Sequence, residues 1–239
     1  YYNEDLLYQM LGINAELLID HAWGVEPTTM QDIKAYKPSA NSQGIGQVLQ
    51  KAYDFEEGLV IIKEMAEALS LSLTEKELTT SVIALNIGYD IASAEVEGFD
   101  GELVYDWYGR AVPKGVHGAC DFKHRTNSSR LFRKGAEQIY RTIVNPNYLI
   151  RRVQIAALDV VPAGKEETAF EQGNLFASME QKQNQQKQQK KEEEREQKAQ
   201  QTILAIKKKY GKNAAVKGTD FEKGATAIER NNEIGGHKA

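Results

Sequence analysis

The sequence predicts an α+β fold in which an antiparallel sheet carries two helices on one face. Two patterns lead to this prediction. Apolar residues recur at helical spacing over residues 54–73, and they alternate with small or polar residues over residues 82–91. Further segments of both kinds give the order strand, helix, strand, strand, helix, strand between residues 43 and 162. This order is typical of a domain with two layers.

In the first half of this domain, a strand is expected over residues 43–49, although Gly44 and Gly46 weaken it. The helix of residues 54–73 follows, and residues 82–91 form a half-buried strand. Residues 103–108 are aromatic and strand-like. Gly109 is then expected to turn the chain, so that residues 117–124 return as the second arm of a hairpin.

In the second half, either Asn127 or Ser128 is expected to cap a helix that runs to Ile143 with one buried stripe. The sequence Asn-Pro-Asn at residues 145–147 ends this helix. Residues 149–161 form the last strand. Arg151 and Arg152 point to opposite sides of that strand, so one of the two is expected to meet a ligand.

Other segments flank this domain on both sides. Residues 1–25 form a helical pair broken near Gly12, either a helix-hairpin-helix that holds a phosphate or an ordinary short pair. Residues 26–42 form a linker between Pro27 and Pro38. The domain of residues 43–162 is followed by a segment over residues 163–177. The final segment is residues 178–239. Its first part, residues 178–201, is rich in Gln, Lys and Glu and is either a solvated helix or a disordered spacer. A basic, Gly-rich end follows.

The charge is distributed unevenly along the chain. Residues 1–109 have a net charge of −14, residues 110–152 of +8, and residues 153–239 of +2. In the basic block, Lys and Arg outnumber Asp and Glu five to one. This block therefore predicts an anion-binding surface, with nucleic acid favoured over a merely solvated basic face.

The candidate DNA-binding residues combine cations with hydroxyl and amide groups, a set suited to phosphate oxygens but not to reading bases. They are Gly12, Asn14, Lys123, Arg125, Thr126, Ser128, Ser129, Arg130, Arg133, Lys134, Arg151 and Arg152. The first two belong to the helical pair, and the others belong to or border the basic block.

Composition excludes several other classes of protein. Of the 239 residues, 41% are hydrophobic, and no run of eighteen apolar residues would cross a membrane. No secretory leader is visible, and the single Cys120 fits a reducing cytoplasm. The four histidines have no metal-site spacing, and the carboxylates are scattered, so no catalytic or metal-binding residues are expected. Tyr1 opens inside an apolar pattern, which indicates a piece of a longer protein.

A short peptide follows the predicted domain. Gln172, Leu175 and Phe176 have the Gln-x-x-Leu-Phe form that bacterial sliding DNA clamps bind, in which the apolar pair fills a pocket and the amide fixes the orientation. Gly173 loosens this peptide and should weaken its docking. The alternative is that these residues form the last apolar turn of the folded domain.

Several motifs together resemble a known family, the bacterial Y-family translesion DNA polymerases. The Gram-positive branch, which is similar to polymerase V catalytic subunits and ultraviolet-resistance proteins, is the nearest match. The motifs lie at Leu11–Ile13, Leu17–Glu26, Tyr36–Pro38, Ser42–Leu49, Tyr108–Arg110, Val112–Lys114, His117–Gly118, Ile206–Ala214, Gly224–Thr226, Glu229–Asn231 and Ile234–Lys238.

The resemblance implies a role for each segment. Residues 1–25 would be the end of the thumb, residues 43–162 the little finger that contacts template-primer DNA, and residues 163–177 the clamp-binding segment. The palm that holds the catalytic carboxylates and Mg²⁺ in this family has no counterpart in the sequence, so no cofactor is expected here. The family would place the protein in the cytoplasm, in the SOS response to DNA damage, and a recombinase or accessory SOS subunit stays open as a partner.

Two alternatives remain from the sequence. The chain could be a non-catalytic module that competes for DNA or the clamp and so modulates a polymerase. An RNA-binding domain with the same order of elements would need aromatic residues on its central strands, and Tyr89 and Tyr105 are the candidates.

Overall fold

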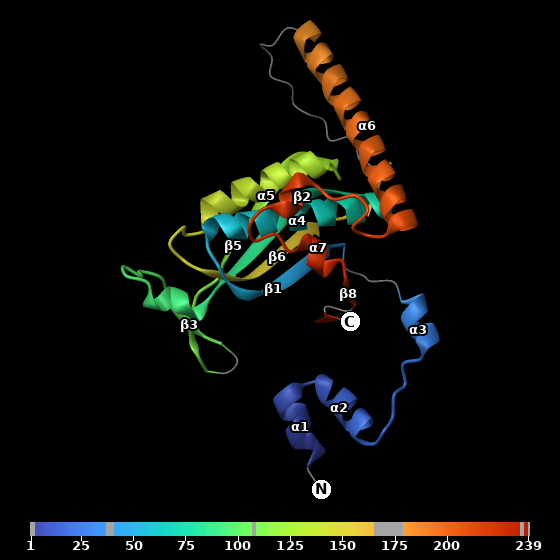
Figure 1. Ribbon diagram of the computed structural model, residues 1–239. Coiled ribbons are helices and arrows are strands. Elements are labelled where there is room, and N and C mark those ends of the chain that lie inside the picture. Colours follow the sequence, from blue (N-terminus) through green and yellow to red (C-terminus); the bar gives the residue numbers. More distant parts are fainter. Residues whose placement is uncertain (1–2, 37–40, 107–108, 165–178, 235–236, 239) are drawn as a thin grey trace. The chain divides into compact units, whose positions relative to one another are not determined.

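The structure is a computed structural model that describes residues 3–36, 41–106, 109–164, 179–234 and 237–238 (Figure 1). The chain divides into two compact units, Tyr1–Ala40 and Asn41–Ala239. The first unit contains the helices α1 (Glu4–Leu11), α2 (Asn14–Ala22) and α3 (Met30–Ala35).

The predicted helical pair is present as α1 and α2. Asn3 caps α1, because its side chain accepts the backbone N–H of Asp5. Gly12 ends the helix with φ of 58°, a backbone conformation that glycine adopts without strain. The short helix α3 lies inside the expected linker, where Thr29 and Asp32 form a capping box.

The second unit is built on a sheet of four long strands, β1 (Gln43–Tyr53), β2 (Leu78–Tyr89), β5 (Val116–Thr126) and β6 (Ile150–Leu158). Their spatial order is β1-β6-β2-β5, and each neighbouring pair is antiparallel. A short strand, β7 (Val161–Pro162), pairs with the beginning of β2. The predicted antiparallel sheet is therefore confirmed.

Two helices, α4 (Phe55–Glu75) and α5 (Ser129–Ile143), lie side by side over one face of this sheet (Figure 1). Each connects two strands that are separated in the sheet by one antiparallel strand. Alternate strand residues such as Ile83, Leu85 and Ile155 pack with α4 and α5 to form the core. Of the two candidate caps of α5, Ser128 occupies the position, and its hydroxyl accepts the N–H of Leu131.

The predicted hairpin of residues 103–108 with 117–124 is wrong. Residues Leu103–Tyr105 (β3) pair instead with Ala111–Pro113 (β4), and β5 pairs with β2. The turn is tighter than expected, because the carboxylate of Asp106 accepts both the backbone N–H and the Nε–H of Arg110. The chain is then free to enter the sheet at Val116, and alternate β5 residues face α5.

The C-terminal part begins with α6 (Met179–Tyr210), so of the two expectations for residues 178–201 the helix is confirmed. After α6 the chain forms a 3₁₀ turn (Gly218–Phe221), helix α7 (Ala227–Arg230) and the strands β8 (Glu233–Ile234) and β9 (His237–Lys238). Thr226, just before α7, contacts Gln47 of β1 and Glu64 of α4. Within the described part of the chain, every helix is too short or too polar to cross a membrane.

Candidate nucleic-acid interface

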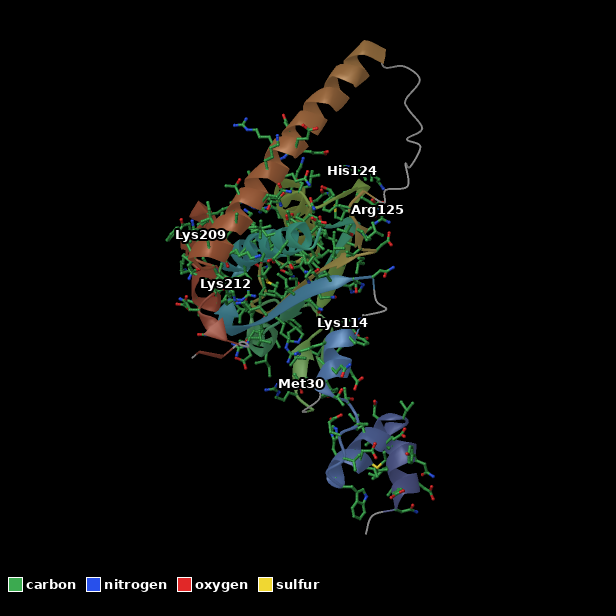
Figure 2. The ribbon with its side chains drawn as sticks, turned by 90° about the vertical axis from the view of Figure 1, so that its right-hand side faces the viewer. Met30, Lys114, His124, Arg125, Lys209 and Lys212 are labelled. Atoms are coloured by element: carbon green, nitrogen blue, oxygen red, sulfur yellow. The ribbon has the colours of Figure 1, made fainter. Side chains whose placement is uncertain are left out.

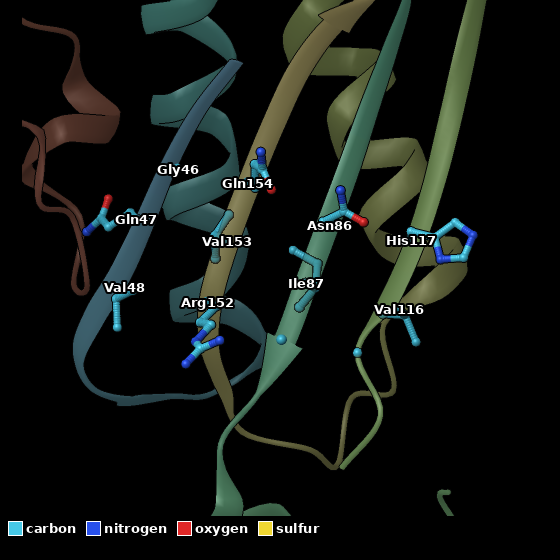
Figure 3. A pocket seen from close by; sticks show the side chains of 12 residues that line it. Gly46, Gln47, Val48, Asn86, Ile87, Val116, His117, Arg152, Val153 and Gln154 are labelled. Carbon is cyan, nitrogen blue, oxygen red and sulfur yellow. The ribbon is translucent and has the colours of Figure 1, made fainter. Parts of the chain in front are cut away.

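The face of the sheet opposite α4 and α5 is open. Strand register arranges its side chains in cross-strand rows, because paired residues of an antiparallel sheet lie directly opposite one another. One row crosses all four strands and consists of Gly46, Gln154, Asn86 and His117. All four are exposed, and Figure 3 shows the three polar side chains next to one another. With strands about 4.8 Å apart, this row is about 14 Å long.

A second row places a cation beside these amides. Arg152 lies between Val48 of β1 and Gly88 of β2. A Cβ on Gly88 would come within 3.1 Å of the Cβ of Arg152, so glycine leaves room for the stem of the arginine. In the described part of the chain, no carboxylate lies within ion-pair distance of Arg152, which leaves its guanidinium available to an anion.

The third row is almost without side chains. It consists of Gly44, Ala156, Ala84 and Ala119. A backbone or sugar could therefore approach the strands closely along this row. Together the first two rows line a shallow hollow of about 530 Å³, to which Gly115 and Val116 also contribute.

The predicted site residues fall into several separate groups. Arg152 is the predicted residue that belongs to the three rows described above. The Arg151 guanidinium instead donates to the carbonyl of Gln50 at 3.0 Å and lies 3.8 Å from Asp90. The two arginines therefore lie in different surroundings, and which of them meets a ligand stays a prediction.

Two cations at the end of β5, near His124 (Figure 2), have partners within the chain. Lys123 donates to Asp121 through both its backbone N–H and its ammonium, and these contacts lower the pKa of Asp121 below its ordinary value. The Arg125 guanidinium donates to the carbonyl and the carboxylate of Asp159 at 2.7 and 2.6 Å. Arg125 therefore joins the end of β5 to the turn after β6.

Four residues cluster at the beginning of α5. Thr126, Ser128 and Ser129 are buried, and the Ser128 hydroxyl and the Arg130 backbone N–H both donate to Glu196 of α6. Farther along the same helix, Arg133 is half-buried and Lys134 is exposed. Since α5 covers the face of the sheet opposite the open one, these residues and Arg152 cannot contact one flat ligand together.

The remaining predicted residues lie elsewhere. Gly12 and Asn14 belong to the first compact unit, where both are exposed. Gln172, Leu175 and Phe176 lie outside the described residues. Tyr89 is only 7% exposed on the core side of β2, whereas Tyr105 is 81% exposed on β3. The two tyrosines therefore do not form the stacking surface that RNA recognition on the sheet would need.

Sequence reasoning did not select Asn86, Gln154 or His117 as candidate site residues. For the first two a signal was present, because small or polar residues alternate with the apolar core positions in β2 and β6, as in Ala84, Asn86 and Gly88. That pattern indicates a flat face. The row of amides becomes visible only when the register between strands is known.

The arrangement can hold phosphate oxygens without reading bases. Asn86 and Gln154 present amide donors, His117 presents an imidazole, and Arg152 adds a permanent positive charge. Contacts of this kind position a nucleic-acid backbone and carry no sequence information themselves. Among the described residues, no group of three or more His, Cys, Asp or Glu could hold a metal ion.

Comparisons with known proteins gave structural neighbours only. No protein-family model and no curated protein matches the chain. The solved structures to which it is similar are Y-family DNA polymerases. They include an insertion ternary complex of Dbh DNA polymerase (TM-score 0.36, 14% identity), a Y-family chimera of Dbh and Dpo4 (0.35, 16%) and DinB from Sulfolobus solfataricus (0.35, 16%). Each match covers 67% of this chain.

The chain spans about two fifths of the length of these polymerases, 39% of the Dbh chain and 40% of the DinB chain. At such TM-scores and identities, the similarity does not assign a function to any residue.

Proposed function

We propose that this chain is the DNA-binding part of a polymerase that copies damaged DNA, and that the open sheet face holds the phosphate backbone of template-primer duplex. The observation that carries this proposal is the row of Gln154, Asn86 and His117 beside Arg152, which has no ion-pair partner in the described part of the chain. The sequence resemblance to translesion polymerases agrees with it.

The geometry suits lesion bypass for a physical reason. Contacts to phosphates and sugars are the same whatever the base, so a damaged base removes none of them. The glycine and alanine row allows the backbone to lie close to the strands, where short amide side chains reach it. Binding of this type is electrostatic in part, and its strength therefore falls as salt concentration rises.

Nucleotidyl transfer itself is assigned to residues outside this chain. The Mg²⁺ ions of such a reaction need clustered carboxylates, and the described residues contain no cluster of that kind. We therefore derive no catalytic step from these residues. Their role in the proposed polymerase is to hold the duplex in register.

Clamp tethering is the second part of the proposal. The peptide with Gln172, Leu175 and Phe176 would dock on a sliding clamp and raise the local concentration of the polymerase on DNA. Replacing Leu175 and Phe176 by alanine should abolish capture by the clamp and leave duplex binding unchanged. Clamp capture that survives the double substitution would contradict this assignment.

A pair of matched substitutions tests the open face. Gln154→Glu places a negative charge in the polar row, whereas Gln138→Glu makes the same change at an exposed position of α5, on the other side of the sheet. Titration of a fluorescent duplex should show weaker binding for Gln154→Glu and little change for Gln138→Glu. Equal losses in the two variants would mean that the open face is not where DNA binds.

A further inference from the structure

Residues 223–230, near the C-terminal end of the chain, pack against α4 beside the edge of the sheet. They contain two of the sequence motifs, Gly224–Thr226 and most of Glu229–Asn231, which have no part in the proposed DNA contacts. Carboxylates of α4 hold this segment. Glu64, which is 5% exposed, accepts the backbone N–H groups of Thr226 and Ala227 at 3.0 and 3.3 Å. One turn of chain is thereby tied to a buried acceptor.

A glycine allows the segment to lie this close to α4. Gly224 has φ of 92°, a conformation that residues with a Cβ rarely adopt. A Cβ there would also come within 3.0 Å of the Cβ of Glu57 and 3.2 Å of its Cα. The ammonium of Lys223 lies 3.1 Å from the carboxylate of the same Glu57. A larger residue at position 224 would therefore push the segment away from the helix.

The segment also binds β1, the edge strand of the sheet, through Gln47. The amide of Gln47 donates to the hydroxyl of Thr226 at 3.1 Å, and its oxygen accepts the guanidinium of Arg230 at 2.9 Å. Figure 3 shows this side chain pointing away from Gln154 and the rest of the polar row. Within the described part of the chain, β6 is the one strand partner of β1, and their regular pairing ends at Val48. The contact at Gln47 therefore supports β1 on the side that has no neighbouring strand.

The supported part of β1 belongs to the proposed DNA-binding face. Gly44, Gly46 and Val48 are the β1 positions of the three cross-strand rows. A second hollow, of about 640 Å³, lies between β1 and the segment, and it shares Gly46, Gln47 and Val48 with the hollow on the open face. Edge strands with few contacts open more readily than central ones. Loss of the contact at Gln47 would therefore loosen one end of every row.

We propose that residues 223–230 are a clasp that keeps β1 in the DNA-binding sheet, with Thr226 and Arg230 as positioning residues that act through Gln47. The clasp rests on the proposed DNA-binding function and gives the C-terminal motifs a part in it. When the clasp is released, β1 opens, and duplex affinity falls in proportion to the fraction of molecules in which β1 stays in place.

Two substitutions that leave the charge unchanged release the clasp by different routes. Gly224→Ala pushes it away from α4, and Gln47→Met removes both hydrogen bonds to β1 while it keeps a side chain of similar length. Gly218→Ala is the control for the first, because an added Cβ there meets nothing within 4 Å. Gln50→Met is the control for the second, at an exposed position of the same strand.

Hydrogen exchange on the whole chain without DNA measures the clasp directly. The loss of one hydrogen bond changes an opening equilibrium about 5-fold, so the amides of residues 44–48 should exchange about 5-fold faster or more in Gly224→Ala and Gln47→Met. The amides of β2 should stay protected and report an intact domain, and both controls should match wild type. Unchanged β1 exchange in both released variants would overturn the clasp.

Titration of a fluorescent duplex over a salt series measures the consequence for binding. If β1 is in place in about a fifth of the molecules, the affinity of Gly224→Ala falls about 5-fold, with the slope of log K against log salt unchanged. A smaller slope would show that cations of the clasp contact phosphate themselves and would overturn the positioning role, as would wild-type affinity in both released variants. Failure of wild type to bind any duplex would overturn the proposed function, whereas β1 exchange would still decide the clasp.

Discussion

Arg152→Gln is the sharpest test of the proposed DNA contact on the open face. The guanidinium is exposed on the open face, has no ion-pair partner among the described residues, and lies over a glycine that leaves room for its stem. Since it makes no structural contact with a carboxylate, its removal should change binding without changing the fold. Circular dichroism and thermal unfolding of the variant check this premise.

The size of the effect follows from counterion release. Each phosphate contact contributes about 0.9 to the slope of log K against log salt on duplex DNA. If the non-ionic part of binding is unchanged, the loss of one contact lowers affinity about 8-fold at 0.1 M salt and about 2-fold at 0.5 M. The difference at 0.1 M corresponds to about 1.2 kcal/mol. Fluorescence anisotropy over a salt series measures both the affinities and the slope.

A matched control separates this site from general charge effects. Arg141→Gln removes the same charge from α5, where the guanidinium pairs with Glu137 at 3.0 Å on the helical side of the sheet. We expect its slope to equal that of wild type. Identical slopes for the Arg152 variant and wild type would refute the reasoning, and so would a larger change in Arg141→Gln.

Two further predictions concern the fold. Burial raises the pKa of Glu64, so the folded state binds this proton more tightly than the unfolded state does. The stability that the proton contributes is therefore lost as pH rises from about 4.5 through the raised pKa. Glu64→Gln should therefore flatten the dependence of stability on pH in chemical unfolding, and a steeper dependence in the variant would contradict this. Gly58→Ala should destabilise the domain by about 1–3 kcal/mol in spite of its better helix propensity. The reason is that its Cβ would lie 2.5 Å from Ile150 Cδ1 and 2.6 Å from Tyr140 Oη. Gly218→Ala, with nothing within 4 Å, should unfold like wild type.

The sheet and its two helices could be predicted from the sequence because their periodicities are strong. The stripe of α4 and the alternation around Ile83 and Leu85 each identify one element without any long-range information. The prediction of the hairpin was wrong because strand pairing is not given by the periodicity of a single element. Strand partners depend on turn geometry, and the contact of Asp106 with Arg110 closes the chain sooner than Gly109 alone indicates.

The candidate site, like the fold, could be predicted from the sequence only in part. A charge count located the basic block, but it could not distinguish cations that are already paired from those that are available. Arg125 and Lys123 have carboxylate partners within the domain, whereas Arg152 has none among the residues that the structure describes. Asn86 and Gln154 carry no charge, so only the register that places them beside Arg152 marks them as site residues.

The small number of available charges on the open face has a consequence for the proposed enzyme. With Arg152 as the one unpaired arginine of the cross-strand rows, the sheet alone gains little from counterion release, and its grip on DNA should be weak and short-lived. A weak grip allows the polymerase to leave once a lesion is passed, but it also makes arrival slow. The proposed clamp-binding peptide would correct this, because a tether supplies an effective concentration of about millimolar order without any new contact to DNA. On this reasoning, the sparse sheet face and the proposed tether together suit transient binding.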